Sequence, residues 1–189
     1  KKSSIFSLAF FACTLLFSQQ DETLFGKNGL RLTGAWGGTN IGLTHFRDEG
    51  AVTNGGFLGL EFNKLVLIGF GGMETSESVN FSQNVPGSFD FDCGGFLVQF
   101  TPRSHRVLHP KFSFLMGGGE VKVKDADNDD VFVVQPGAGA EVNIFRWFRL
   151  SLEASYRFVS GSDLEVLSDK DLSGLIWDLK FRFGWSWGK

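Results

Sequence analysis

The final stretch of the chain, LIWDLKFRFGWSW, alternates strictly between large apolar residues and smaller or charged ones. Because successive residues of a β-strand point to opposite faces of a sheet, this stretch predicts a strand with one apolar face and one charged face. The apolar set is Leu175, Trp177, Leu179, Phe181, Phe183, Trp185 and Trp187, and Asp178, Lys180 and Arg182 lie between its members.

Two earlier segments repeat this alternation. In FRLSLEASYRFV an apolar face lies opposite Arg149, Glu153 and Arg157, and in VFVVQPGAGAEVNI an apolar face lies opposite Gln135 and Glu141. Noisier alternation elsewhere completes a set of expected strands. Their approximate ranges are 33–45, 51–62, 65–75, 88–101, 111–123, 131–143, 148–159 and 173–187.

The connections between these strands alternate in kind. Short turns such as NK and FRW, and a basic connection PRSHRVLHP, alternate with longer, mostly acidic loops. This layout predicts an all-β fold, a transmembrane antiparallel up-and-down eight-stranded β-barrel in the outer membrane. The short turns would then face the periplasm and the acidic loops the outside of the cell.

Strand length and residue placement favour a lipid-facing barrel over a soluble one. Soluble strands usually have about 5–6 residues, whereas a tilted strand needs about 9–11 to cross a bilayer. Trp147, Phe148, Trp185 and Trp187 stand at strand ends, as interfacial aromatic girdles do. A one-residue slip of the last strand would turn Lys180 and Arg182 toward lipid, at roughly 2–4 kcal/mol each near the midplane.

The first residues have the pattern of an export signal. Lys1 and Lys2 precede the apolar run IFSLAFFACTLLF, so we expect a signal peptide over 1–18, a periplasmic segment over 19–32 and the barrel over 33–189. A lipoprotein signal with Cys13 as the lipidated residue is the disfavoured alternative, because the apolar run continues past it. Cys93 then has no partner for a disulfide and is expected as a small apolar strand residue.

Composition agrees with a glycine-rich barrel. The chain has 25 Gly and 22 Phe, and its net charge of −3 with no basic stripe argues against a nucleic-acid partner. Gly137, Gly139 and Gly184 would leave room for long charged neighbours inside a barrel. Pro136 lacks the N–H that a closed barrel needs, so a β-bulge is expected there.

A family resemblance rests on three stretches: GGFLGLEFNKLVLIGFGGM, DDVFVVQPGAGAEVNIFRWFRLSLEASYRFVSG and LSGLIWDLKFRFG. From about Gly34 to Gly184 the chain resembles small glycine-rich outer-membrane β-barrel proteins of Gram-negative bacteria. The resemblance implies an eight-stranded barrel and carries over no catalytic residue. One departure concerns the insertion machinery, which often reads a terminal aromatic residue, whereas Gly188 and Lys189 follow Trp187 here.

The candidate site is a polar network inside the barrel. We interpret it first as a structural polar core, because an eight-stranded barrel is just wide enough for side chains to fill. A lining for a narrow pore is the alternative. The network would comprise Glu141, Arg149, Glu153, Arg157, Asp178, Lys180 and Arg182.

Catalytic, metal and cofactor sites are not expected. His105 and His109 fall in the basic turn, where a solvated role is favoured, and His45 stands alone near the outer end of the first strand. The loop KDADNDD offers Asp125, Asp127 and Asp129 for a divalent cation, but it lacks the Gly and Glu of an EF-hand. A solvated acidic loop is favoured over a divalent site or a bridge to lipopolysaccharide.

These patterns favour a non-enzymatic outer-membrane protein with a structural or surface-interaction role. Its contact surface would be the loops around 76–87, 124–130 and 160–172. A narrow channel for water, ions or small solutes is the runner-up, and an accessory subunit of a larger envelope complex is the third hypothesis. The expected partners are outer-membrane lipid, lipopolysaccharide and the insertion machinery.

Overall fold

The computed structural model describes residues 29–47, 49–82, 85–124, 128–164 and 167–187. The expected signal peptide therefore lies outside the described residues, as does most of the segment 19–32. The first strand begins at Leu32. The elements are β1 (Leu32–Phe46), β2 (Glu49–Phe62), β3 (Val66–Thr75), β4 (Val79–Ser82), β5 (Val85–Phe100), β6 (Leu108–Val123), β7 (Asp129–Phe145), β8 (Phe148–Ser160), the one-turn helix α2 (Asp169–Leu172) and β9 (Gly174–Ser186).

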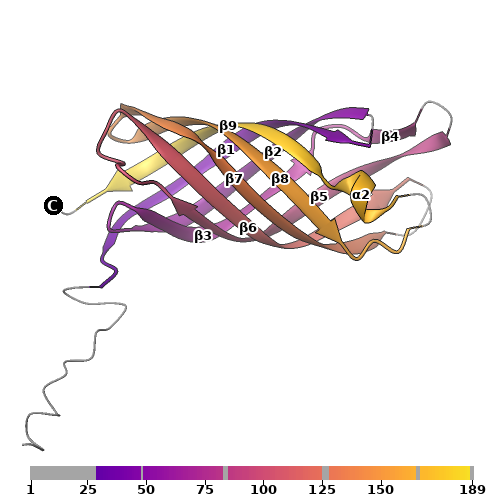
Figure 1. Ribbon diagram of the computed structural model, residues 1–189, viewed down its shortest axis with the longest axis horizontal. Coiled ribbons are helices and arrows are strands. Elements are labelled where there is room, and N and C mark those ends of the chain that lie inside the picture. The colour runs from indigo at the N-terminus through magenta and orange to yellow at the C-terminus, as the bar shows by residue number, and fades with distance from the viewer. Residues whose placement is uncertain (1–28, 48, 83–84, 125–127, 165–166, 188–189) are drawn as a thin grey trace, which may run out of the picture. The chain divides into compact units, whose positions relative to one another are not determined.

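Eight of these strands close into an antiparallel barrel (Figure 1). They follow the order β3-β2-β1-β9-β8-β7-β6-β5, and β3 pairs with β5 to complete the ring. The first and last strands pair along most of their length, with Asn40 opposite Lys180. The short strand β4 pairs only with β5 among the described strands. The expected fold class and its eight strands are confirmed.

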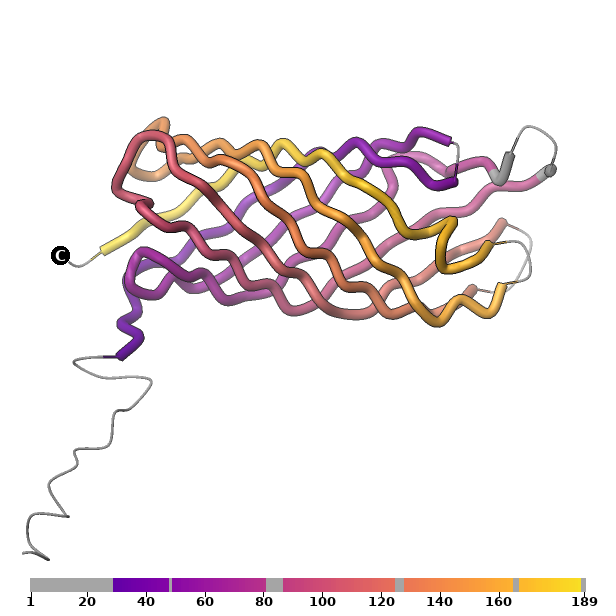
Figure 2. Tube along the Cα trace, viewed as in Figure 1, coloured from indigo at the N-terminus to yellow at the C-terminus, as the bar shows by residue number. Residues whose placement is uncertain are grey.

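The two ends of the barrel differ in their connections (Figure 2). At one end, called the turn end below, lie residues 63–65, 101–107 and 146–147 between paired strands. At the other, called the loop end, lie β4, α2, residues 76–78 and the described parts of the connections between β6 and β7 and between β8 and β9. In an outer-membrane barrel the short turns face the periplasm and the longer loops face outward.

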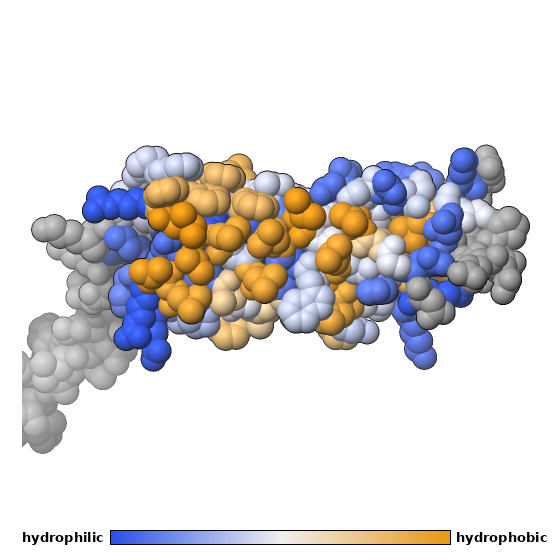
Figure 3. Space-filling view, turned by 90° about the horizontal axis from the view of Figure 1, so that it is seen from above, coloured by the Kyte–Doolittle hydropathy of each residue, from blue (hydrophilic) through white to orange (hydrophobic). Residues whose placement is uncertain are grey.

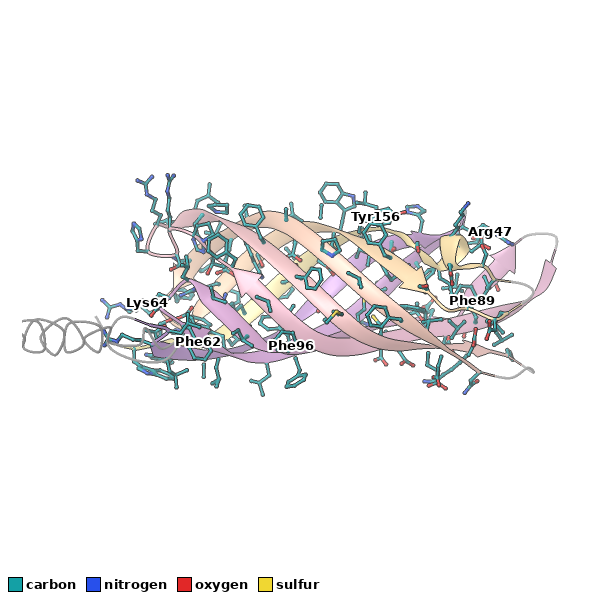
Figure 4. All side chains as sticks on the ribbon, turned by 60° about the horizontal axis from the view of Figure 1, so that its bottom comes forward. Arg47, Phe62, Lys64, Phe89, Phe96 and Tyr156 are labelled. Atoms are coloured by element: carbon teal, nitrogen blue, oxygen red, sulfur yellow. The ribbon has the colours of Figure 1, made fainter. Side chains whose placement is uncertain are left out.

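Exposed apolar side chains form a belt on the outside of the barrel, and Figure 3 shows one face of it. Its side chains alternate with buried ones along the strands, as the sequence pattern predicts. Phe96 of β5 and Tyr156 of β8 point away from the barrel and are about two-fifths exposed (Figure 4). The belt includes Leu58, Leu60, Phe70, Phe112, Phe114, Leu152, Phe158, Trp177, Leu179, Phe183 and Trp185.

Toward the loop end the pattern inverts, which the sequence analysis did not anticipate. On β5, Phe89 and Phe91 are buried whereas Asp90 is exposed. On the paired strand β6, Val121 is buried and Lys122 is exposed. A polar outside around an apolar inside is the arrangement of a protein in water. The strands therefore continue past the belt into solvent, and β7, at 17 residues, exceeds the roughly 9–11 that a bilayer requires.

The bulge expected at Pro136 is absent. Val134 pairs with Phe158 and Gly137 with Ser155, so β7 and β8 keep one register across Pro136. Between these two pairs, the positions at Gln135 and Pro136 are unpaired, and the register shift of this ladder lies elsewhere, between Asn143 and Phe145. On the other side, Pro136 lies opposite Phe114 of β6 with no shift. The proline is therefore accommodated by an interrupted ladder instead of an extra residue.

Among the described residues, no helix is long and apolar enough to cross a membrane.

Candidate functional site

The half of the barrel interior toward the turn end holds a network of buried charges. Arg182 Nη2 lies 3.2 Å from Glu61 Oε1, and Arg182 Nη1 lies 3.4 Å from Glu141 Oε1. Arg149 Nη1 approaches the same Glu141 oxygen at 3.3 Å. These side chains come from strands β2, β7, β8 and β9, so the network crosses the interior instead of following one strand.

A second part of the network centres on Glu153. Lys180 Nζ donates to Glu153 Oε1 at 2.6 Å, and Ser113 Oγ donates to the same oxygen at 2.6 Å. Lys111 Nζ lies between the two parts, 3.7 Å from Glu141 Oε2 and 3.8 Å from Glu153 Oε2. Asp178 accepts a hydrogen bond from Asn40 Nδ2 at 2.9 Å. Buried ions need such multiple partners, because desolvation of an unpaired ion is strongly unfavourable.

Two like charges of the network, Arg149 and Arg182, share a carboxylate and an aromatic ring as partners. Arg149 and Arg182 lie directly opposite each other on β8 and β9, a placement that repels. The shared carboxylate of Glu141 lies within ion-pair distance of both guanidinium groups. Their guanidinium carbons also lie 4.1 and 4.7 Å from the Trp36 ring centre, as in cation–π contacts. The indole Nε1 donates a hydrogen bond to Ser186 Oγ at 3.1 Å, so the one polar atom of the buried Trp36 side chain has a partner.

Six of the seven expected network residues meet in this half of the interior, and Arg157 does not. Arg157 is fully buried, and no carboxylate of the described residues lies within ion-pair distance of it. Its Nε donates to the carbonyl oxygen of Leu172 at 2.7 Å. Its guanidinium carbon lies 4.1 Å from the ring centre of Phe46 and 4.8 Å from that of Phe91. Arg157 therefore belongs to the apolar half of the interior, and its place in a charge network is corrected.

His109 is also placed differently from the expectation. It lies on β6, is 2 % exposed, and its Nε2 lies 3.2 Å from Glu141 Oε1. The solvated role in a basic turn therefore fails for His109, although it fits the exposed His105. The basic connection is shorter than the sequence suggested, because β6 begins at Leu108.

The network contains residues that the sequence analysis missed. Glu61, Lys111, Asn40 and Trp36 all point inward and are buried. Glu61 stands between Leu60 and Phe62, so the same alternation that identified Glu153 could have identified it. Trp36 offered no such signal, because glycines surround it in the sequence.

The half of the interior toward the loop end is an apolar core. Phe46 packs edge-on against Phe89 with ring centres 5.5 Å apart. Leu167 and Leu172, from the connection between β8 and β9, are at most 1 % exposed and close this end. The remaining members include Met73, Cys93, Val121, Val131, Val133, Val159 and Ile176. The expected role of Cys93 as a small apolar strand residue agrees with its burial.

The connection between β8 and β9 is held by a surface ion pair. Arg47 Nε and Nη2 donate to the two carboxylate oxygens of Asp171 at 3.0 and 3.1 Å (Figure 4 labels Arg47). The Arg47 backbone N–H also donates to the carbonyl oxygen of Asp171 at 3.0 Å. The hydrogen bonds from Arg47 hold the pKa of the Asp171 carboxyl below its ordinary value.

Between the two halves lies a small cavity of about 40 Å³. It has room for only a few water molecules, at roughly 10–15 Å³ each. Gln99 reaches it fully buried, and neither its amide nitrogen nor its amide oxygen has a hydrogen-bond partner among the described residues. Asn40, Gln135, Asp178 and Lys180 also line it. Buried side chains of the charge network lie on one side of this cavity, and those of the apolar core lie on the other.

The expected divalent loop is only partly visible. Asp125 and Asp127 lie outside the described residues. Asp129 begins β7 and accepts hydrogen bonds from Ser162 Oγ at 3.2 Å and from the Asp163 backbone N–H at 2.8 Å. No three His, Cys, Asp or Glu side chains in the described part of the chain gather as a metal site requires.

Comparison with solved structures supports the fold. The model matches Neisserial surface protein A (NspA) with a TM-score of 0.61 and 7 % identity, over 82 % of this chain and 99 % of that one. It matches the N-terminal β-barrel domain of OprF from Pseudomonas aeruginosa with a TM-score of 0.54 and 13 % identity, over 82 % and 98 %. It matches Ail of Yersinia pestis with a TM-score of 0.52 and 14 % identity, over 81 % and 97 %.

No protein-family model matches the chain. No curated protein matches it either. The chain has the fold of the small eight-stranded outer-membrane β-barrels, and the apolar belt agrees with a location in the outer membrane.

Proposed function

We propose that this chain is a sealed, non-enzymatic outer-membrane barrel that acts through its loop end as a surface-interaction protein. The filled interior carries this proposal. Buried charges occupy one half, buried aromatic and aliphatic side chains occupy the other, and Leu167 with Leu172 closes the outer mouth. The part of the barrel that projects beyond the apolar belt is then the part that contacts other molecules.

The chemistry of this projecting part favours a positively charged partner. Among the described residues, its basic side chains are Arg47, Lys122, Lys124 and Lys170. Its acidic side chains are more numerous: Glu49, Glu74, Glu77, Asp90, Asp92, Glu120, Asp129, Asp130, Asp163, Asp169 and Asp171. Complementary charge raises association rates and selects partners.

The ligand of one structural neighbour has a negative charge, the opposite of the charge that this acidic surface would attract. The Ail structure is a complex with the heparin analogue sucrose octasulfate, a polyanion. An acidic loop end repels such a ligand, so we propose a different partner class for this chain.

The two other hypotheses make distinct claims. A channel needs a continuous path, whereas the interior cavity of about 40 Å³ is flanked by buried side chains on both sides. An accessory subunit would use the same loop-end surface or the belt, and it would be recognised by stable co-purification with a complex. The filled interior favours the surface-interaction role over the channel.

The test uses the barrel in phosphatidylcholine nanodiscs and two soluble probes, a decalysine peptide and heparin. We expect decalysine to bind, binding to weaken with salt, and heparin not to bind. A variant with Glu74→Gln, Asp90→Asn and Asp130→Asn should lose several-fold in affinity for decalysine. A control with Arg103→Gln and Arg146→Gln at the turn end should retain it. Preference for heparin, or equal decalysine binding by the acidic variant, would overturn the proposal.

A further inference from the structure

The turn end is the basic counterpart of the acidic loop end. Its three connections, 63–65, 101–107 and 146–147, contain Lys64, Arg103, Arg106 and Arg146 and no acidic residue. The nearest interior carboxylates, Glu61 and Glu141, are already within ion-pair distance of Arg149 and Arg182. Among the described residues, no ion pair involves Arg103, Arg106 or Arg146, so the positive charge of these three side chains is not balanced at the turn end.

These turns surround an open bowl of about 1040 Å³ at the mouth of the barrel. Lys64, Arg103, His105 and Arg146 line its rim (Figure 4 labels Lys64). Arg149 also lines the bowl, although it is 8 % exposed and also contacts the buried network. Cationic groups thus reach the bowl from the β2–β3, β5–β6 and β7–β8 connections and from β8.

Backbone and side-chain hydrogen bonds hold these turns together. Ser104 Oγ donates to the carbonyl oxygen of Lys64, which links two of the turns. Asn143 Nδ2 donates to the carbonyl oxygens of Ser104 and Arg106, each at 2.8 Å, which links β7 to the same turn. Lys64 and Arg103 both adopt left-handed backbone angles, with φ of 56° and 60°. Side chains other than glycine take this conformation when their surroundings enforce it, so the cations stand on an ordered frame.

One wall of the bowl is continuous with the apolar belt. Ile144, Phe145 and Trp185 line the bowl and are about 44–61 % exposed. Phe145 stacks on Trp147 with ring centres 5.5 Å apart, forming an aromatic edge. Aromatic residues in such positions lie at the level of the lipid headgroups. A ligand with a negatively charged head and apolar tails would place the head in the bowl and the tails along the belt.

We propose that the turn-end bowl binds the phosphate of an anionic phospholipid from the inner leaflet. Arginine side chains bind phosphate oxygens through paired, charge-assisted hydrogen bonds. Basic pockets at the membrane boundary recognise phospholipids with two phosphates in this way. This site lies at the opposite end of the barrel from the proposed contact surface, so lipid binding at the bowl and partner binding at the loop end can be tested independently.

The test measures lipid retention by native mass spectrometry. The barrel is released from micelles that contain equal amounts of cardiolipin, phosphatidylglycerol and phosphatidylcholine. We expect retention in the order cardiolipin, phosphatidylglycerol, phosphatidylcholine. The variant Arg103→Gln/Arg146→Gln should lose about tenfold in cardiolipin retention. Lys122→Gln/Lys124→Gln, which removes the same charge at the loop end, should leave it unchanged. Heat-modifiable gel mobility verifies that each barrel is folded.

A second arm distinguishes lipid phosphate from free phosphate. Inorganic phosphate and pyrophosphate are added to the same samples at concentrations above that of the lipid. Continued cardiolipin retention supports a lipid site. Binding of phosphate with no preference among the lipids overturns the assignment to a lipid headgroup. Equal retention by the turn-end variant and the loop-end control overturns the site altogether.

Discussion

The guanidinium carbon of Arg157 lies 4.1 Å from the ring centre of Phe46, inside an apolar core to which no described residue contributes a carboxylate. Its Nε donates to the Leu172 carbonyl oxygen, but both Nη atoms have no hydrogen-bond partner among the described residues. Arg182 is equally buried and lies within ion-pair distance of Glu61 and Glu141. Two arginines at similar burial therefore have opposite surroundings.

We predict that these arginines respond oppositely to replacement by methionine. Arg157→Met removes a buried charge without a counter-ion and should be neutral or stabilising by about 1 kcal/mol. Arg182→Met removes one cation from the buried carboxylates Glu61 and Glu141, which then have only Arg149 between them and Lys111 beside Glu141, and should destabilise by up to roughly 3–5 kcal/mol. Urea unfolding in detergent, followed by gel mobility, measures both. Equal destabilisation would mean that Arg157 has a counter-ion that its surroundings do not show.

Neighbouring glycines on β6 offer a second contrast. A Cβ on Gly117 would lie 2.2 Å from the carbonyl oxygen of Gly94 on the adjacent strand. A Cβ on Gly118 would meet no atom within 4 Å. Gly117→Ala should therefore destabilise the barrel by about 1–3 kcal/mol through overpacking, while Gly118→Ala changes little. Matched unfolding midpoints for the two variants would show that β5 and β6 can separate without penalty.

The pair between Arg47 and Asp171 makes closure of the loop end depend on pH. The pKa of the Asp171 carboxyl is lowered in the folded protein. Its ionised form therefore stabilises the closed loop end fully above the unfolded pKa of about 3.9. This stabilisation is lost as the pH falls through the lower folded pKa. We expect pepsin cleavage within 161–173 to rise between about pH 4 and pH 2. The effect should be modest, because the pair lies at the surface.

The variant Asp171→Asn tests the origin of this pH dependence. Cleavage should then be fast and nearly constant across the same pH range, after correction for the activity of the protease on an unfolded substrate. A control variant, Asp130→Asn, should keep the wild-type profile. A profile unchanged by Asp171→Asn would assign the opening to another group.

Alternation of apolar and charged residues was sufficient to predict the inward and outward faces of the strands that carry charges on one face. Between Leu175 and Trp187, and between Phe148 and Phe158, each side chain lies on the predicted face. The inside could be distinguished from the outside because aspartate, lysine and arginine are unfavourable in lipid. Pro136 was misread because the sequence does not show that a ladder can lose two pairs and keep its register.

The position of each inward side chain along the barrel axis could not be predicted from the sequence. Alternation shows that Arg157 points inward, as Arg182 does, but not that Arg157 lies among Phe46, Phe91 and Leu172. Those contacts join residues far apart in the chain. His109 was assigned to a turn because the sequence did not mark where β6 begins. The inversion from a charged to an apolar interior likewise depends on how far each strand projects beyond the belt.

Planar-bilayer conductance measures directly whether the interior of the barrel is sealed. The refolded barrel is inserted, and its folded state is verified by heat-modifiable mobility. A sealed interior predicts a silent membrane, both for the wild type and for a variant in which the connection 161–168 is shortened. Steady openings in the wild type, with an ion selectivity that Glu141→Gln changes, would contradict it and make the buried network the lining of a pore.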